Sequence, residues 1–151
     1  MITYTNIVNR FSEFVRLNPF VKTFSFGSPA DVDLDKIGEY PILHLVYTGA
    51  NYDGTTKTYT FEVYILDNAP NNESKEDFQK GAITNAEQIA EDIIADMERG
   101  GTVFTFQHRF DVASASTVPL EEEGSNVLSG VLLNLAVTVG YEQDSCNSPL
   151  T

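Results

Sequence analysis

The feature that most constrains the fold is a long run of alternating side chains near the C-terminus, from Val127 to Tyr141. From Val131 to Tyr141 every second residue is apolar, and most residues between them are small or polar, as in a strand with one buried face. A second segment, from Lys57 to Asp67, repeats this alternation. Two such strands predict a sheet with one apolar face, which other elements must cover.

Two predicted helices supply that cover. From about Glu76 to Arg99, apolar residues recur at steps of three and four, which places them on one face of a helix. A shorter helix is predicted from Thr5 to Leu17, with Thr5 or Asn6 as its N-cap and Asn18-Pro19 as its end. The apolar stripe of the longer helix consists of Ala86, Ile89, Ala90, Ile93, Ile94 and Met97.

The remaining strands are shorter. Val21–Phe26 alternates, and so does Thr102–Phe110. Pro41–Thr48 is predicted to form a hairpin with Lys57–Asp67, through a turn that contains Asp53-Gly54. Glycine there provides the positive φ that such a turn needs.

Two long segments are predicted as loops that face a partner. They run from Gly27 to Glu39 and from Val112 to Asn126, and both are longer than a compact domain needs. Residues 142–151 have no periodicity and are predicted to form a flexible C-terminal tail.

The order of elements predicts an α+β fold, with a mostly antiparallel sheet and two helices packed on one face. A length of 151 residues suits a single domain that spans residues 1–151. No apolar run approaches about 18 residues, so we expect no membrane partner. The first residues, MITYTNIVNRF, lack a basic stretch followed by an apolar one, which predicts no secretory signal.

The charge is strongly unbalanced. The chain has 22 acidic and 9 basic residues, a formal charge of -13. Proteins that bind nucleic acid do so with Lys and Arg that replace counterions on phosphates, so this composition disfavours specific DNA or RNA binding.

No motif predicts catalysis. His44 and His108 lie in different predicted strands, and the alternatives for them are a base and its partner, or ligands of one metal. We expect each instead to be a partly buried residue with a hydrogen bond. Cys146 lies in the tail, where no pocket shields a nucleophile. The sequence therefore predicts a protein that is not an enzyme.

No cofactor or metal is predicted either. Asp31, Asp33 and Asp35 begin like a calcium loop, but Gly38 and Glu39 fall at the wrong offsets. Gly100-Gly101 follows a helix instead of preceding one, so it does not form a phosphate site at a helix N-terminus.

Three stretches resemble small virion proteins of tailed bacteriophages of the crAss-like type. They are GSPADVDLDKIGEYPILHLVYTGANYDGTTKTYTFEVYILD, NAEQIAEDIIADM and PLEEEGSNVLSGVLLNLAVTVGYEQDSCNSPL. The resemblance spans about Gly27 to Leu150 and includes no catalytic motif. It implies a head-to-tail connector: a neck ring, a tail terminator or a tail-completion protein, with a tail-terminator-like α+β fold.

The resemblance also implies partners and a location. The partners are copies of the chain in a ring of six or twelve and adjacent portal, neck or tail proteins, while genome DNA passes through without specific binding. The location is the virion neck or tail, after synthesis in the bacterial host cytoplasm. Ring number and layer do not transfer, because these families diverge strongly.

The longer helix carries acids opposite its apolar stripe. Glu87 and Glu91 are four residues apart and repel each other, so they do not stabilise the helix. An acidic lumen would keep DNA from adhering, and a solvated helix face is the alternative. The candidate channel-lining residues are Glu87, Glu91, Asp92 and Glu98.

The predicted loops and tail supply candidate contacts between subunits or layers. These are Asp31, Asp33, Asp35, Glu121, Glu122, Glu123, Cys146 and Leu150. A second class of function is an acidic binding module, monomeric or dimeric, that mimics DNA. An enzyme is the third class and would require His44 and His108 to meet in a pocket with an acid.

Overall fold

The computed structural model describes residues 2–28, 39–68, 75–99, 103–104, 110–123 and 128–140. The loop candidates Asp31, Asp33 and Asp35, the histidine His108 and the tail lie outside these ranges. The elements in chain order are α1 (Tyr4–Leu17), β1 (Thr23–Phe26), β2 (Ile42–Asp53), β3 (Thr56–Asn68), α2 (Lys75–Glu98), β4 (Phe110–Glu123) and β5 (Leu128–Gly140).

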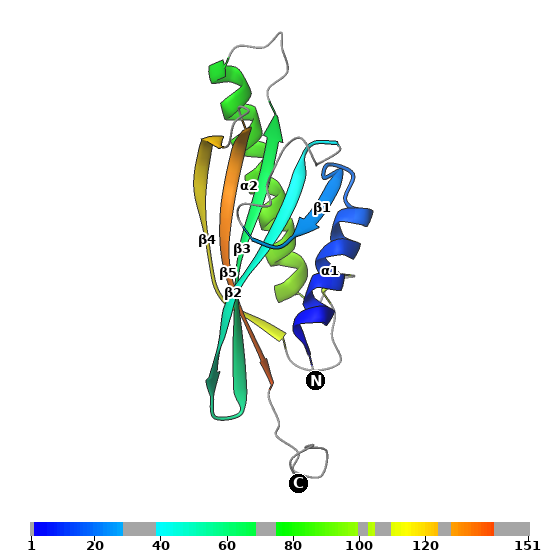
Figure 1. Cartoon of the computed structure of the whole chain (residues 1–151), viewed down its shortest axis with the longest axis vertical. Helices are drawn as coiled ribbons and strands as arrows, with labels where there is room; N and C mark the ends of the chain where they lie inside the picture. The colour runs from blue at the N-terminus through cyan, green and yellow to red at the C-terminus, as the bar shows by residue number, and fades with distance from the viewer. Residues whose placement is uncertain are drawn as a thin grey trace.

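The five strands form one sheet in the order β1-β2-β3-β5-β4. The pairs β2–β3, β3–β5 and β4–β5 are antiparallel, and only β1 runs parallel to its neighbour, β2. The outer strands of the described sheet are therefore β1, with α1 beside it, and β4 at the opposite side (Figure 1). The α+β prediction with a mostly antiparallel sheet is confirmed.

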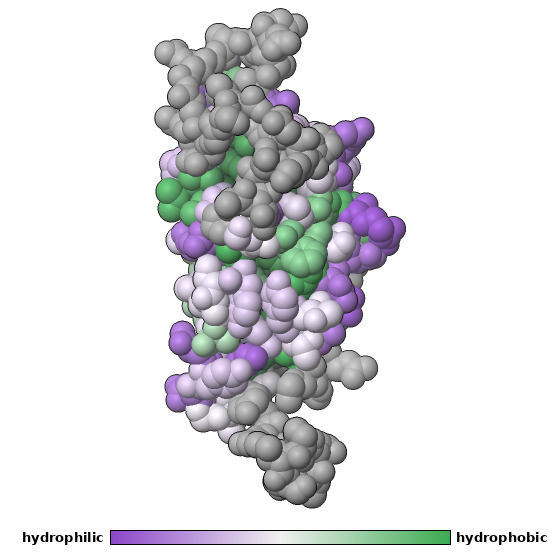
Figure 2. Space-filling view, viewed as in Figure 1, coloured by the Kyte–Doolittle hydropathy of each residue, from purple (hydrophilic) through white to green (hydrophobic). Residues whose placement is uncertain are grey.

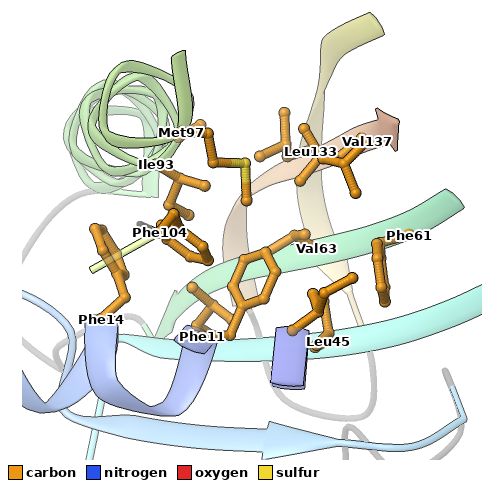
Figure 3. Packing of buried hydrophobic residues seen from close by; sticks show 14 of the residues in the cluster. Phe11, Phe14, Leu45, Phe61, Val63, Ile93, Met97, Phe104, Leu133 and Val137 are labelled. Carbon is orange, nitrogen blue, oxygen red and sulfur yellow. The ribbon is translucent and has the colours of Figure 1, made fainter. Parts of the chain in front are cut away.

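Both helices cover the same face of the sheet. The buried residues of α1, including Phe11 and Phe14, meet the α2 stripe and the inward side chains of β3 and β5 in one cluster (Figure 3). The ring of Phe11 packs edge-on against Phe104, with 4.9 Å between the centroids. Burial of these apolar side chains is the main stabilising contribution to the fold.

The α1 N-terminus differs from the prediction by two residues. Thr3, not Thr5 or Asn6, is the N-cap: its hydroxyl accepts from the Asn6 amide, and the Asn6 side chain accepts from the Thr3 amide. This reciprocal pair resembles a capping box, with Asn in the place of Glu or Gln. The predicted end is confirmed, because Asn18 is extended before Pro19.

The β2–β3 hairpin is longer than predicted. Its strands continue to Asp53 and from Thr56, so Gly54 and Thr55 alone form the turn. Gly54 has a φ of 58°, as the turn prediction required. The hairpin reaches past the helices at one end of the molecule (Figure 1).

Strand β4 corrects the prediction of a loop from Val112 to Asn126. Residues up to Glu123 pair with β5, with register shifts at Val112/Ser114 and Glu121/Glu123. The segment has small and polar side chains on both faces, so it shows little alternation in hydropathy, and pairing with β5 determines its conformation. Val103 and Phe104, predicted as strand, instead form a bend with both side chains buried.

The other face of the sheet is mostly polar, with several threonines and the carboxylate of Glu62, which accepts a hydrogen bond from the Tyr64 hydroxyl at 3.0 Å. Thr48 donates to Thr60 at 2.8 Å, and the hydroxyls of Thr58 and Thr138 are 2.9 Å apart across β3 and β5. Figure 2 shows a surface on which pale and purple areas of intermediate and hydrophilic residues surround smaller green, apolar ones. A small apolar cluster of Ile42, Leu66 and Leu128 lies at the other end of the same strands.

We predict that Gly130→Ala strongly destabilises the fold. A Cβ on Gly130 would meet the carbonyl oxygen of Ile65 and lie 2.9 Å from its carbon, and both atoms belong to the backbone of paired strand β3. We expect a loss of about 2–3 kcal/mol in urea unfolding followed by circular dichroism. Gly140→Ala, at the end of the same strand with open space around it, is the control. Equal stability of the two variants would contradict the close strand approach.

Candidate functional site

An open groove of about 360 Å³ lies between α2 and β4. Glu87, Glu91 and Ile94 line it from the helix, and residues 115–117 line it from the strand. Ala115 and Thr117 lie opposite Leu135 and Leu133 of β5, but their short side chains leave the space beside α2 unfilled. The groove is thus a direct consequence of small residues on an outer strand.

The outer strand β4 is weakly protected along much of its length. Residues 112–118 (VASASTV) contain no charge and no proline. Ala113 to Val118 are all exposed. Natural proteins usually protect an edge strand with charges, proline or a short length, because its free backbone groups can pair with another chain. In β4 the charges and the proline lie at the two ends, with Asp111 before this stretch and Pro119 and the three glutamates at 121–123 after it, and a register shift lies at Val112/Ser114.

The four candidate channel-lining acids do not share one flank of α2. Glu87 and Glu91 line the groove, and exposed Glu98 lies two turns beyond Glu91. Asp92 is rotated by about 100° from Glu91 and is half-buried, with a 3.2 Å hydrogen bond from Gln88. The apolar stripe in the sequence predicted that all four acids lie away from the core. It did not predict that Asp92 lies on a different flank of α2 from Glu87 and Glu91.

The other predicted contact residues are only partly within the described ranges. Glu121, Glu122 and Glu123 belong to β4 and not to a loop. Cys146 and Leu150 lie outside the described residues.

His44 is completely buried in β2 and has two hydrogen bonds. Its Nε2 lies 2.8 Å from the Ser28 carbonyl oxygen, which only accepts, so Nε2 bears the proton. In the neutral ring, Nδ1 then accepts from the Ser25 hydroxyl at 2.6 Å. The expectation of a strand histidine with a hydrogen bond is confirmed for His44, but the expected partial burial is wrong because the side chain is fully buried. Its two hydrogen bonds join Ser25 of β1 and the following Ser28 to β2.

Asp96 is a structural residue that the sequence did not reveal. Its Oδ2 accepts from the amides of Val103 at 3.2 Å and Phe104 at 2.6 Å. The carboxylate thereby positions the bend after α2, and the bend inserts the Phe104 ring into the core between Phe11 and Phe14. The only available signal was that Asp96 follows Ile93 of the apolar stripe by about one helical turn. Periodicity alone does not reveal which groups such an acid contacts.

The α1 side carries a different charge from the groove. Arg16 donates through Nε to Glu13 at 2.9 Å, and this hydrogen bond holds the pKa of the exposed Glu13 carboxyl below its usual value. Residues 2–28 contain Arg10, Arg16 and Lys22 but only one acid, Glu13. This is a basic excess in a strongly acidic chain.

Within the described ranges, no three His, Cys, Asp or Glu side chains cluster so as to hold a metal ion. Neither of the described helices combines enough length and apolar character to cross a membrane.

Comparison with known proteins supports the fold alone. No protein-family model matches the sequence, and no curated protein matches it significantly. Among solved structures, 21 chains match. One of them, whose name states no function, has a TM-score of 0.52 and 13% sequence identity, and the match covers 93% of this chain and 94% of that chain. At this identity the likeness extends to nearly the whole architecture and not to activity.

We predict that Asp96→Ala lowers the free energy of unfolding by about 1.5–3 kcal/mol. The substitution leaves two amides near the core without their charged acceptor. Chemical denaturation measures the loss. Asp92→Ala, one turn earlier, removes only a contact with exposed Gln88 and should change stability by less than about 0.5 kcal/mol. Similar losses in both variants would refute the positioning role of Asp96.

We predict that Asp67→Asn slightly stabilises the protein at pH 7, by on the order of 0.5 kcal/mol. Partial burial raises the pKa of the Asp67 carboxyl above 3.8, although the Asn68 amide donates to it. An acid with a raised pKa in the folded state favours folding more as the pH falls from neutral toward 3.8. The variant should lack this gain.

Thermal melts at several pH values measure both effects. Asp53→Asn removes a charge at the exposed hairpin turn and is the control. If the two variants show the same pH dependence, burial of Asp67 is not the cause.

Proposed function

We propose that this chain is a non-enzymatic structural protein of a tailed-phage virion. It forms one subunit of a ring in the neck or tail connector and joins the portal and head to the tail. The resemblance of the three sequence stretches supports the proposal, and the α+β architecture is the one which that resemblance implies. The proposed partners are further copies of the chain and the adjacent portal, neck or tail proteins.

The observation that carries the proposal is the difference between the two lateral sides of the molecule, at the outer strands β1 and β4. A ring needs two unlike patches on each subunit, so that one patch of a copy meets the other patch of the next copy. Here α1 and β1 form one side, and α2 with the long outer strand β4 forms the other. An interface between copies at these sides leaves no outer strand exposed in the closed ring.

The acidity suits a passage for DNA. A lumen lined with carboxylates repels phosphates. It also lacks the basic groups that bind DNA by displacing counterions, so the genome is not held in place. We retain Glu87, Glu91, Asp92 and Glu98 as candidate lining residues, of which Glu87, Glu91 and Glu98 are exposed.

Electron microscopy of particles made by the phage that encodes this chain tests the location. With a small tag on the chain, we expect a ring of extra density at the junction of head and tail. Absence of the protein from intact particles would overturn the proposal. If the free protein then displaces DNA from a basic DNA-binding protein, the acidic DNA mimic becomes the better assignment.

We predict that removing the α2 charges outside the groove alters genome release. Particles with Asp92→Asn and Glu98→Gln together keep the groove acids Glu87 and Glu91, so they should assemble but release DNA more slowly, because phosphates adhere to a less acidic lumen. Release is followed by the fluorescence of a DNA dye. The control neutralises Glu39 and Asp53, which lie off α2. Unchanged release by the α2 variant would remove the lining role.

A further inference from the structure

The two sides of the sheet have opposite charge. The α1–β1 side, residues 2–28, contains three basic residues and one acid. The α2–β4 side contains seven acids and three basic residues in 75–99, and four acids with no basic residue in 110–123. Because β1 and β4 are the outer strands, the basic residues beside β1 and the acids of β4 lie at opposite edges of the sheet, and α2 lies across the face between them (Figure 1).

The two sides also differ in shape and polarity. The α1–β1 side presents three of the large exposed apolar side chains: Leu17, Phe20 and Phe26 are each more than half exposed. The α2–β4 side has the open groove, with carboxylates Glu87 and Glu91 on the helix wall and small side chains on the strand wall. One side therefore offers projections among basic groups, and the other offers a groove among acidic groups.

We propose that copies of this chain associate head to tail in solution, with the α1–β1 side of one copy on the α2–β4 groove of the next. This rests on the proposed function for its biological setting, and it adds the surface by which the ring closes. The partner of the groove is a second copy because the same chain carries the complementary charge, and the uncharged stretch 112–118 of β4 brings no repulsion to the contact.

The contact is compatible with an acidic lumen. The acids of the α2–β4 side outnumber the basic residues of the α1–β1 side several-fold, so pairing leaves a large negative excess. In a ring, every boundary between copies opens onto the lumen at its inner end. Glu87 and Glu91 can thus hold a neighbour while acids such as Glu98, outside the groove, remain unpaired by the basic side.

A charge-swap experiment tests the contact. Two variants are prepared: Arg10→Glu with Lys22→Glu on the basic side, and Glu87→Lys with Glu91→Lys in the groove. Sedimentation velocity at 50 mM and 500 mM salt should show concentration-dependent association of the wild type that is weaker at high salt. Each variant alone should associate at least about tenfold more weakly, and their equimolar mixture should regain wild-type affinity to within about threefold.

Controls separate this contact from a general charge effect. Asp92→Lys with Glu98→Lys changes the net charge as the groove variant does, but both positions lie outside the groove, so this variant alone should not show the tenfold weaker association expected of the groove variant. Circular dichroism melts check that every variant is folded.

Several results would overturn the inference. They are a wild-type protein that stays monomeric at about 1 mM in low salt, swap variants that associate like the wild type, or a mixture that does not regain affinity. The proposed function can fail independently of this contact. If the protein self-associates as expected but is absent from particles, the virion role is wrong and the contact stands. If a ring at the neck still forms from either swap variant alone, the contact is wrong and the virion role stands.

Discussion

The pairing of β3 with β5 is the constraint on which the rest of the structure depends. Thirteen residues of each strand pair without a register shift, from Thr56↔Gly140 to Asn68↔Leu128. This register aligns two apolar faces into one, with Phe61 opposite Leu135 and Val63 opposite Leu133. A slip of one residue would turn every apolar side chain of one strand to the wrong face, so burial fixes the alignment. Gly130 allows the close approach at one end.

The position of β5 beside β3 determines what remains for β4. The strand that follows β3 in the chain is β4, but β5 lies beside β3 in the sheet. Strand β4 therefore pairs with β5 alone and has one free edge. Helix α2 contacts β3, β5 and β4, but its buried stripe is directed at the large side chains of the core. The small residues of β4 do not reach the helix, and the groove between them follows from that mismatch in side-chain volume.

Periodicity predicted the elements in which one face is buried and the other is not. The α2 stripe, β5 and the inward face of β3 were all predictable because burial imposes a period of 3.6 or 2 on the sequence. Strand β4 was missed because exposed small residues such as Ala115 and Ser116 impose no period. The role of Asp96 was missed because its two amide partners come from residues 103 and 104, whose conformation no local pattern determines.

The distribution of charge along the chain is uneven, which the total charge does not show. A formal charge of -13 spread evenly would make any two copies repel each other at every face. Here α2 and β4 carry an acidic excess and the first 28 residues carry a basic excess, so the proposed contact is one in which unlike charges meet. An uneven distribution of this kind selects a head-to-tail contact over a symmetric one, because a symmetric contact would place like charges together. The acidity that disfavours nucleic acid as a ligand therefore favours directional assembly.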